Sequence, residues 1–212
     1  MIISESNKFI FVHNYKVAGE SIREALEEYS IHPLEKLSTL KCQIAKLGII
    51  GDPNKKHLKS YQIRRLFPNE WKKYFTFGFV RNPWSWQVSL YFYMLQNEDH
   101  WFHDEIRSMD GFEDYIEWRV KEDRVLQSSF FCDKSGKIIV DFVGRLENIQ
   151  SDFREVCRRI GIGASLPHKN ESNHRDYKNY YNRHTKNLVK KGFKKDIEKF
   201  GYSFDGSGRI VY

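Results

Sequence analysis

Two short segments of the chain combine residue types that bind anions. The first runs from His13 to Ser21 and reads HNYKVAGES, with Lys16 near its middle and Gly19 after it. A lysine ammonium is a mobile point charge that suits a phosphate or sulfate oxygen. The second begins at Arg81-Asn82-Pro83 and extends to Ser89. A guanidinium together with a hydroxyl can grip two oxygens of one phosphate group.

Local patterns place each segment between a strand and a helix. Phe9–His13 is a short apolar run that predicts a buried strand, and Glu20–Tyr29 has apolar residues at helical spacing. Tyr74–Val80 predicts a second strand, followed by a helix at Trp84–Gln96 with Asn82-Pro83 as its cap and first turn. A helix N-terminus offers unpaired N–H groups and a favourable dipole, so both segments are candidate anion sites.

Each segment also has a plain structural explanation. The first is not a Walker A loop, which places its lysine directly before the helix, because Lys16 lies three residues before the only glycine. An ordinary strand–turn–helix with a surface lysine explains it equally well. In the second segment, a capping interaction or salt bridge would explain Arg81. Tight packing in a crowded helix is the favoured explanation for Ser89 taken alone.

The remaining elements predict one α/β domain. Helices are expected at Leu34–Lys46, Tyr61–Phe67 (ended by Pro68), Phe112–Arg119, Asn148–Ile160 and Lys186–Phe200. Strands are expected at Gln127–Cys132 and Lys137–Val143, paired around a turn at Asp133–Gly136. Helices that alternate with short apolar strands favour a sheet covered on both faces. No repeat or linker interrupts the sequence, so a single domain spanning residues 1–212 is expected.

The composition limits the class of partner and compartment. With 40% hydrophobic and 30% charged residues the chain is globular, and its net charge of +7 favours anionic partners without choosing among them. Cys42, Cys132 and Cys157 are scattered and lack a CxxC pair, which argues against a disulfide framework or zinc site and fits a reducing compartment. The N-terminal apolar run is too short for a signal peptide or membrane span.

Taken together, the two segments resemble the cytosolic-type and Golgi-type sulfotransferases, in particular their carbohydrate (family 2-like) branch. That family has a loop of the form (H/P)xxKxAGxS after its first strand, and a second strand that ends in RNP with a serine eight residues after the arginine. The first pattern is matched by His13, Lys16, Ala18, Gly19 and Ser21. The second pattern is matched by Arg81, Asn82, Pro83 and Ser89.

The resemblance covers nearly the whole chain. Val140–Asn148 looks like the family's strand before a late helix, and Phe200–Phe204 looks like its usual ending. The family's C-terminal loop is resembled by Leu166–Asn170 followed by Tyr177, Tyr180 and Tyr181. One departure is Glu20, where the family usually has threonine or serine. A carboxylate there suits the helix dipole, but it would weaken anion binding if it pointed inward.

The family resemblance implies a fold, a reaction and a donor. The fold would be a P-loop-like three-layer α/β sandwich with a central, mainly parallel sheet. The reaction would transfer a sulfuryl group from 3′-phosphoadenosine 5′-phosphosulfate (PAPS) to a hydroxyl of an acceptor, expected here to be a carbohydrate or glycolipid. No metal is needed. The residues implied for the donor are Lys16, Val17, Ala18, Gly19, Glu20 and Ser21 at the 5′-phosphosulfate, and Arg81 and Ser89 at the 3′-phosphate. Lys16 would also stabilise the leaving phosphate oxygen.

A histidine is the expected catalytic base, because imidazole titrates near neutral pH. We favour His57, which lies in a polar stretch between the two donor segments, where related enzymes also carry a histidine. A solvent-exposed histidine in a basic loop is an almost equal explanation, and Asp104 or Glu105 could serve instead. His13 fits better as part of the loop's scaffold, and His168 as a residue near the acceptor.

Two other functions compete with this interpretation. An ATP-dependent P-loop kinase would need the Walker lysine that the chain lacks. A basic RNA-binding module could use the tyrosines at 177–181 for stacking, but no RNA-binding motif occurs. We therefore expect no nucleic-acid partner. In the absence of a signal sequence or membrane anchor, we expect a cytoplasmic enzyme.

Overall fold

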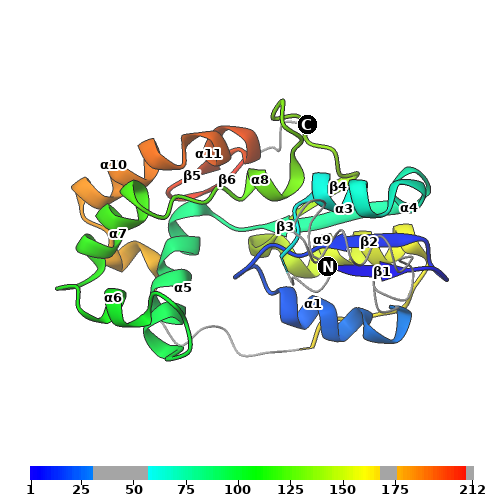
Figure 1. Cartoon of the computed structure of the whole chain (residues 1–212), viewed down its shortest axis with the longest axis horizontal. Helices are drawn as coiled ribbons and strands as arrows, with labels where there is room; N and C mark the ends of the chain where they lie inside the picture. Colours follow the sequence, from blue (N-terminus) through cyan, green and yellow to red (C-terminus); the bar gives the residue numbers. More distant parts are fainter. Residues whose placement is uncertain (31–56, 168–175, 209–212) are drawn as a thin grey trace. The chain divides into compact units, whose positions relative to one another are not determined.

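A computed structural model of the protein describes residues 1–30, 57–167 and 176–208 (Figure 1). The helix expected at Leu34–Lys46 lies outside these residues. The chain divides into two compact units. Unit 1 comprises residues 1–80 and 127–169, and unit 2 comprises residues 81–126 and 170–212. The single domain expected from the sequence stays a prediction.

Unit 1 is built on a four-stranded sheet of order β1-β2-β3-β4. The strands are β1 (Ile2–Ser4), β2 (Phe9–Val12), β3 (Phe75–Val80) and β4 (Phe142–Arg145). β1 pairs antiparallel with β2, whereas β2, β3 and β4 run parallel, with Val12 opposite Gly78 and Val80 opposite Arg145. The carboxyl ends of the parallel strands share one edge of the sheet, which is where ligands bind in open α/β folds.

Helices cover both faces of this sheet (Figure 1). α1 (Gly19–Leu26) and α9 (Ile149–Ile160) share a buried apolar cluster with the phenylalanines of β2 and β3. Each buried phenylalanine contributes roughly 1.5–3 kcal/mol. The opposite face carries Gly78, where a Cβ would lie 2.2 Å from a ring carbon of Phe131 in α8 (Ser128–Phe131). The predicted three-layer α/β architecture with a mainly parallel sheet is confirmed.

Pro68 both follows one helix and begins another. The shorter elements of unit 1 are η1 (Glu27–Tyr29), α3 (Ser60–Leu66), α4 (Pro68–Lys73) and η3 (Leu146–Asn148). The sequence predicted that Pro68 ends a helix, and α3 does stop just before it. It also opens α4, because proline fits the first turn of a helix, where its missing N–H would have no partner.

The predicted hairpin around Asp133–Gly136 is wrong in its first strand. The turn forms, with Gly136 at a φ of 86°, but the pairing beyond it is a single bridge between Cys132 and Ile138. Ser128–Phe131 is helical, and the later strand begins at Phe142 and pairs in parallel with β3. A short apolar run has the same composition in a strand and in a buried helical turn, so periodicity does not distinguish them.

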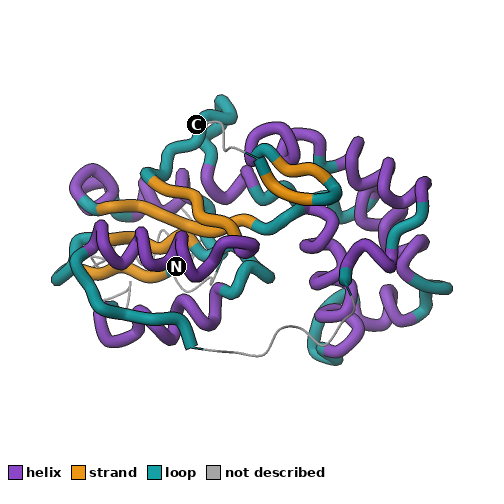
Figure 2. Tube along the Cα trace, turned by 180° about the vertical axis from the view of Figure 1, so that it is seen from behind, coloured by secondary structure: helices purple, strands orange, loops and turns teal. Residues whose placement is uncertain are grey.

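Unit 2 is mostly helical, with one small hairpin among its described residues (Figure 2). Its elements are α5 (Pro83–Gln96), α6 (His103–Arg107), α7 (Phe112–Lys121), η4 (Tyr177–Tyr180), α10 (Arg183–Gly192), α11 (Lys194–Phe200), β5 (Tyr202–Ser203) and β6 (Gly206–Ser207). The helix predicted at Lys186–Phe200 is two helices, α10 and α11, that meet at Phe193. None of the helices in the described ranges has the length and apolar content of a membrane span.

The start of α5 follows its sequence signals closely. The Asn82 side chain accepts hydrogen bonds from the backbone N–H groups of Trp84 at 3.0 Å and Ser85 at 3.4 Å, and Pro83 is the first helical residue. These bonds satisfy donors that the first helical turn cannot pair internally. The predicted cap is therefore confirmed, and it fixes the direction in which the chain leaves Arg81.

Candidate active site

The loop between β2 and α1 has a backbone of alternating handedness. Lys16 and Ala18 have φ values of 60° and 58°, whereas Val17 and Gly19 do not have positive φ. A left-handed conformation costs a residue with a Cβ about 1–2 kcal/mol, so tertiary structure must hold this loop in place. Alternation of this kind turns successive N–H groups toward one side and forms a concave nest for an anion.

Gly19 provides space for a neighbouring histidine. A Cβ at Gly19 would lie only 1.8 Å from Nε2 of His13. The His13 side chain is 2% exposed and its ring stacks on that of Phe11, with 5.5 Å between centroids. The space that a side chain at position 19 would need is therefore filled by the imidazole of the same loop.

His57 lies directly beside this loop. Its Nδ1 is 3.1 Å from the backbone oxygen of His13, and the two imidazole centroids are 4.6 Å apart. A carbonyl oxygen can only accept, so Nδ1 carries the proton, and in the neutral ring Nε2 holds the lone pair. The structure therefore places the favoured histidine next to the loop that carries Lys16, although the two residues are far apart in the sequence.

Asn14 anchors the start of the loop. Its side chain is fully buried, and Nδ2 donates to the Phe79 carbonyl at 3.4 Å and to Oε1 of Gln127 at 3.1 Å. These bonds join the end of β2 to β3 and to the residue before α8. Asn14 was not predicted as a site residue. One sequence signal could have identified Asn14. It is an amide residue directly after the predicted strand Phe9–His13, at a position where an apolar residue would continue the core.

Arg81 and Ser89 belong to unit 2, and a second serine lies between them. Arg81 is 9% exposed, and its Nε donates to Oγ of Ser85 at 2.9 Å. Ser85 and Ser89 are four residues apart on α5, so they lie on the same helix face. Ser89 is buried at 6% exposure. Ser85 was missed from the sequence, although its four-residue spacing from both predicted residues was the signal.

Glu20 turns toward solvent. Its side chain is 59% exposed and its Oε2 lies 3.6 Å from Nη1 of Arg23, one turn further along α1. The alternative bases Asp104 and Glu105 are exposed in the first turn of α6. His168 lies outside the described residues.

Comparison with known proteins assigns the chain to a family. A model of the family described as "Sulfotransferase family" matches residues 1–203. The chain belongs to the sulfotransferase family. The resemblance drawn from the sequence motifs is thereby confirmed, and this membership favours sulfuryl transfer over the kinase and RNA-binding alternatives.

Two individual proteins are similar to this sulfotransferase. The mouse sulfotransferase SULT7A1, solved in complex with PAP, matches with a TM-score of 0.51 and 12% identity, covering 92% of this chain and 86% of that one. At this identity the likeness concerns the fold. An uncharacterized protein of Archaeoglobus fulgidus is 29% identical over 96 residues, which cover 44% of this chain and 72% of that protein.

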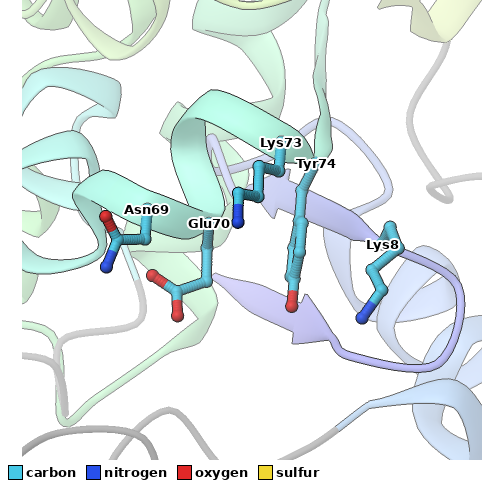
Figure 3. Close-up of a pocket in the computed structure, with 5 residues that line it drawn as sticks. All are labelled: Lys8, Asn69, Glu70, Lys73 and Tyr74. Carbon is cyan, nitrogen blue, oxygen red and sulfur yellow. The ribbon is translucent and has the colours of Figure 1, made fainter.

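A pocket of about 420 Å³ lies elsewhere on unit 1 of the sulfotransferase (Figure 3). It is lined by Lys8, Asn69, Glu70, Lys73 and Tyr74, and the Lys8 ammonium lies 5.3 Å from the centre of the Tyr74 ring. Lys8 precedes β2 and Tyr74 precedes β3, so this pocket is at the amino ends of the strands. The Lys16 loop follows the carboxyl end of β2. We therefore place the candidate active site at the loop and not in this pocket.

Proposed function

We propose that this sulfotransferase takes its sulfuryl group from PAPS and transfers it to a hydroxyl of a carbohydrate or glycolipid. The observation that carries the proposal is the loop of alternating handedness between β2 and α1, with Lys16 within it. Such a loop offers backbone N–H groups and a cation to the same anion. The likeness to a mouse sulfotransferase that was solved with PAP, the desulfated form of the donor, supports the choice of nucleotide.

The donor's two ends are assigned to the two segments found in the sequence. In the proposal the 5′-phosphosulfate is bound by Lys16, Val17, Ala18, Gly19, Glu20 and Ser21. Glu20 contributes through its backbone N–H, since its carboxylate is exposed beside Arg23. The 3′-phosphate is bound by Arg81 and Ser89, and the bond from Arg81 to Ser85 sets the orientation of the guanidinium. Charge-assisted bonds of this kind are about twice as strong as neutral ones.

The transfer is proposed to be a single in-line displacement. The acceptor oxygen forms a bond to sulfur while the bond from sulfur to the phosphate oxygen breaks. Negative charge moves to that leaving oxygen, where Lys16 neutralises it, and Nε2 of His57 takes the proton of the acceptor hydroxyl. Sulfuryl transfer resembles phosphoryl transfer in this respect, so the protein acts mainly through positioning and charge neutralisation.

The acceptor class and the compartment are proposed from the sequence motifs and the composition. A carbohydrate or glycolipid is proposed because the motifs resemble the carbohydrate branch of the family, and the net charge of +7 suits an acidic glycan. A cytoplasmic location is proposed because the three cysteines of the sequence are scattered and lack a CxxC pair, which fits a reducing compartment.

The experiment is a transfer assay with PAPS that carries a radioactive sulfuryl group. Acceptors are neutral and acidic oligosaccharides, glycolipids and simple phenols, each separated from the donor by chromatography. We expect label on a carbohydrate hydroxyl, and a fall of about 100-fold or more in rate for Lys16→Met, the cost of losing one group that stabilises the transition-state charge. Lys72→Met, an exposed lysine on α4, is the matched control. Label on phenols alone would contradict the acceptor class, and label on no acceptor would contradict the proposed activity.

A further inference from the structure

The rings of His13 and Tyr15 contact the imidazole of His57. The centroids of the His13 and His57 rings are 4.6 Å apart, with an interplanar angle of 61°. The Tyr15 ring meets the His57 ring edge-on, with 5.3 Å between centroids and an interplanar angle of 81°. Tyr15 is itself held from another side by Phe130, at 5.4 Å and 89°. These separations are those of attractive edge-to-face contacts, which restrict rotation of a ring as well as stabilising it.

The same imidazole is also oriented by a hydrogen bond. Its Nδ1 lies 3.1 Å from the His13 carbonyl oxygen, which requires the proton on Nδ1. In an unconstrained neutral histidine the proton favours Nε2 instead. The hydrogen bond therefore reverses the intrinsic preference, and it can do so only while the ring stays in its present orientation.

We propose that Tyr15 is a positioning residue that, together with the His13 carbonyl, keeps His57 in the tautomer protonated on Nδ1. This inference rests on the proposed function only for its catalytic meaning, in which His57 is the base. Nε2 then keeps its lone pair, and the ring can take a proton from the acceptor hydroxyl without turning, since the Nδ1 bond is the same in both states. Which nitrogen is protonated is set by the partner of the other one.

The location of Tyr15 links the base to the donor loop. Tyr15 immediately precedes Lys16, and Asn14 before it is tied to β3 and to Gln127. A shift of this loop therefore moves the residue that contacts the leaving group and the residue that orients the base together. The loop pattern that His13 and Lys16 match does not specify the residue at position 15.

The tautomer can be measured without any enzymatic assay. In ¹⁵N-labelled protein, long-range ¹H–¹⁵N spectra of the imidazoles distinguish a protonated ring nitrogen from one that carries a lone pair, and His57→Gln identifies the signals. At a pH where the ring is neutral, we expect protonated Nδ1 and unprotonated Nε2 in the wild type. We expect a mixture of tautomers in Tyr15→Leu. Tyr15→Phe keeps the ring and should keep the wild-type signals, as should Tyr93→Leu on α5.

Kinetics then separate this inference from the proposed function. Tyr15→Leu should lower kcat about 10- to 100-fold, as small displacements of a reacting group do, while the affinity for adenosine 3′,5′-bisphosphate stays within about twofold. The positioning role would be overturned if the His57 ring of the wild type were protonated on Nε2. It would also be overturned if His57 kept the wild-type tautomer in Tyr15→Leu. The wild-type measurement does not depend on the folding of a variant. If the tautomers behave as expected but His57→Gln transfers at the wild-type rate, the positioning stands and the assignment of His57 as base fails.

Discussion

Gly19→Ala sets two physical effects against each other. Gly19 is the first residue of α1, and alanine is favoured over glycine in a helix by about 1 kcal/mol. However, a Cβ at this position would lie 1.8 Å from Nε2 and 2.3 Å from Cδ2 of His13. The buried His13 ring would have to move, and overpacking of this kind costs about 1–3 kcal/mol. We predict that the clash dominates and that the free energy of unfolding falls by up to about 2 kcal/mol.

The assay is urea unfolding of the wild type and four variants. Gly163→Ala is the control, because a Cβ there meets no atom within 4 Å, and its effect should stay within about 0.5 kcal/mol. His13→Ala and the double variant complete a double-mutant cycle. The double variant should be less destabilised than the sum of the single changes, by about 0.5–3 kcal/mol. A Gly19→Ala protein as stable as the wild type, or an additive cycle, would refute the reasoning.

Two further predictions concern a helix cap and a surface ion pair. Asn82→Ala removes the acceptor for two N–H groups of α5 and should lower the free energy of unfolding in urea by about 1 kcal/mol. An unchanged unfolding midpoint would contradict the role of Asn82 as a cap. The guanidinium of Arg158, and then that of Arg159, lowers the pKa of Glu155 from 4.5 to about 2. Because the folded pKa is depressed, this stabilisation is present above about pH 4.5 and is lost as the pH falls toward 2. Glu155→Gln should therefore flatten the stability–pH curve in that window, most clearly at low salt, and an identical curve would exclude the effect.

The fold could be predicted where local signals agreed with one another. Phe9–Val12 and Phe75–Val80 are apolar and aromatic, and each is followed by a helix signal, so both strands followed from the sequence. Asn82 and Pro83 fixed the start of α5 for the same reason. Ser128–Phe131 was misassigned because four residues are too few to distinguish a helical turn from a strand. The helix Ser128–Phe131 packs against β3 because Gly78 leaves room for the Phe131 ring. This contact joins residues far apart in the sequence, so a local pattern does not reveal it.

The candidate site was predictable in its residue types but not in its geometry. Lys16 stood out because it lies between a strand and a helix. The left-handed backbone at Lys16 and Ala18 could not be inferred, since neither residue type favours that conformation. The contact of His57 with His13 joins distant parts of the chain, and so does the contact of Asn14 with Gln127. Such contacts depend on packing, which local sequence patterns do not encode.

The central claim is that the loop at Lys16 and the residue Arg81 bind the donor nucleotide. Calorimetric titration with adenosine 3′,5′-bisphosphate tests it most directly, on the wild type, Arg81→Ala and the control Lys72→Met. We predict tight binding by the wild type and the control and little response to ATP. Arg81→Ala should lose about 10- to 100-fold in affinity, as expected for a charge-assisted bond worth about 1.5–3 kcal/mol. A well-folded wild type that does not bind the bisphosphate, or that binds ATP with Mg²⁺ in its place, would contradict the account.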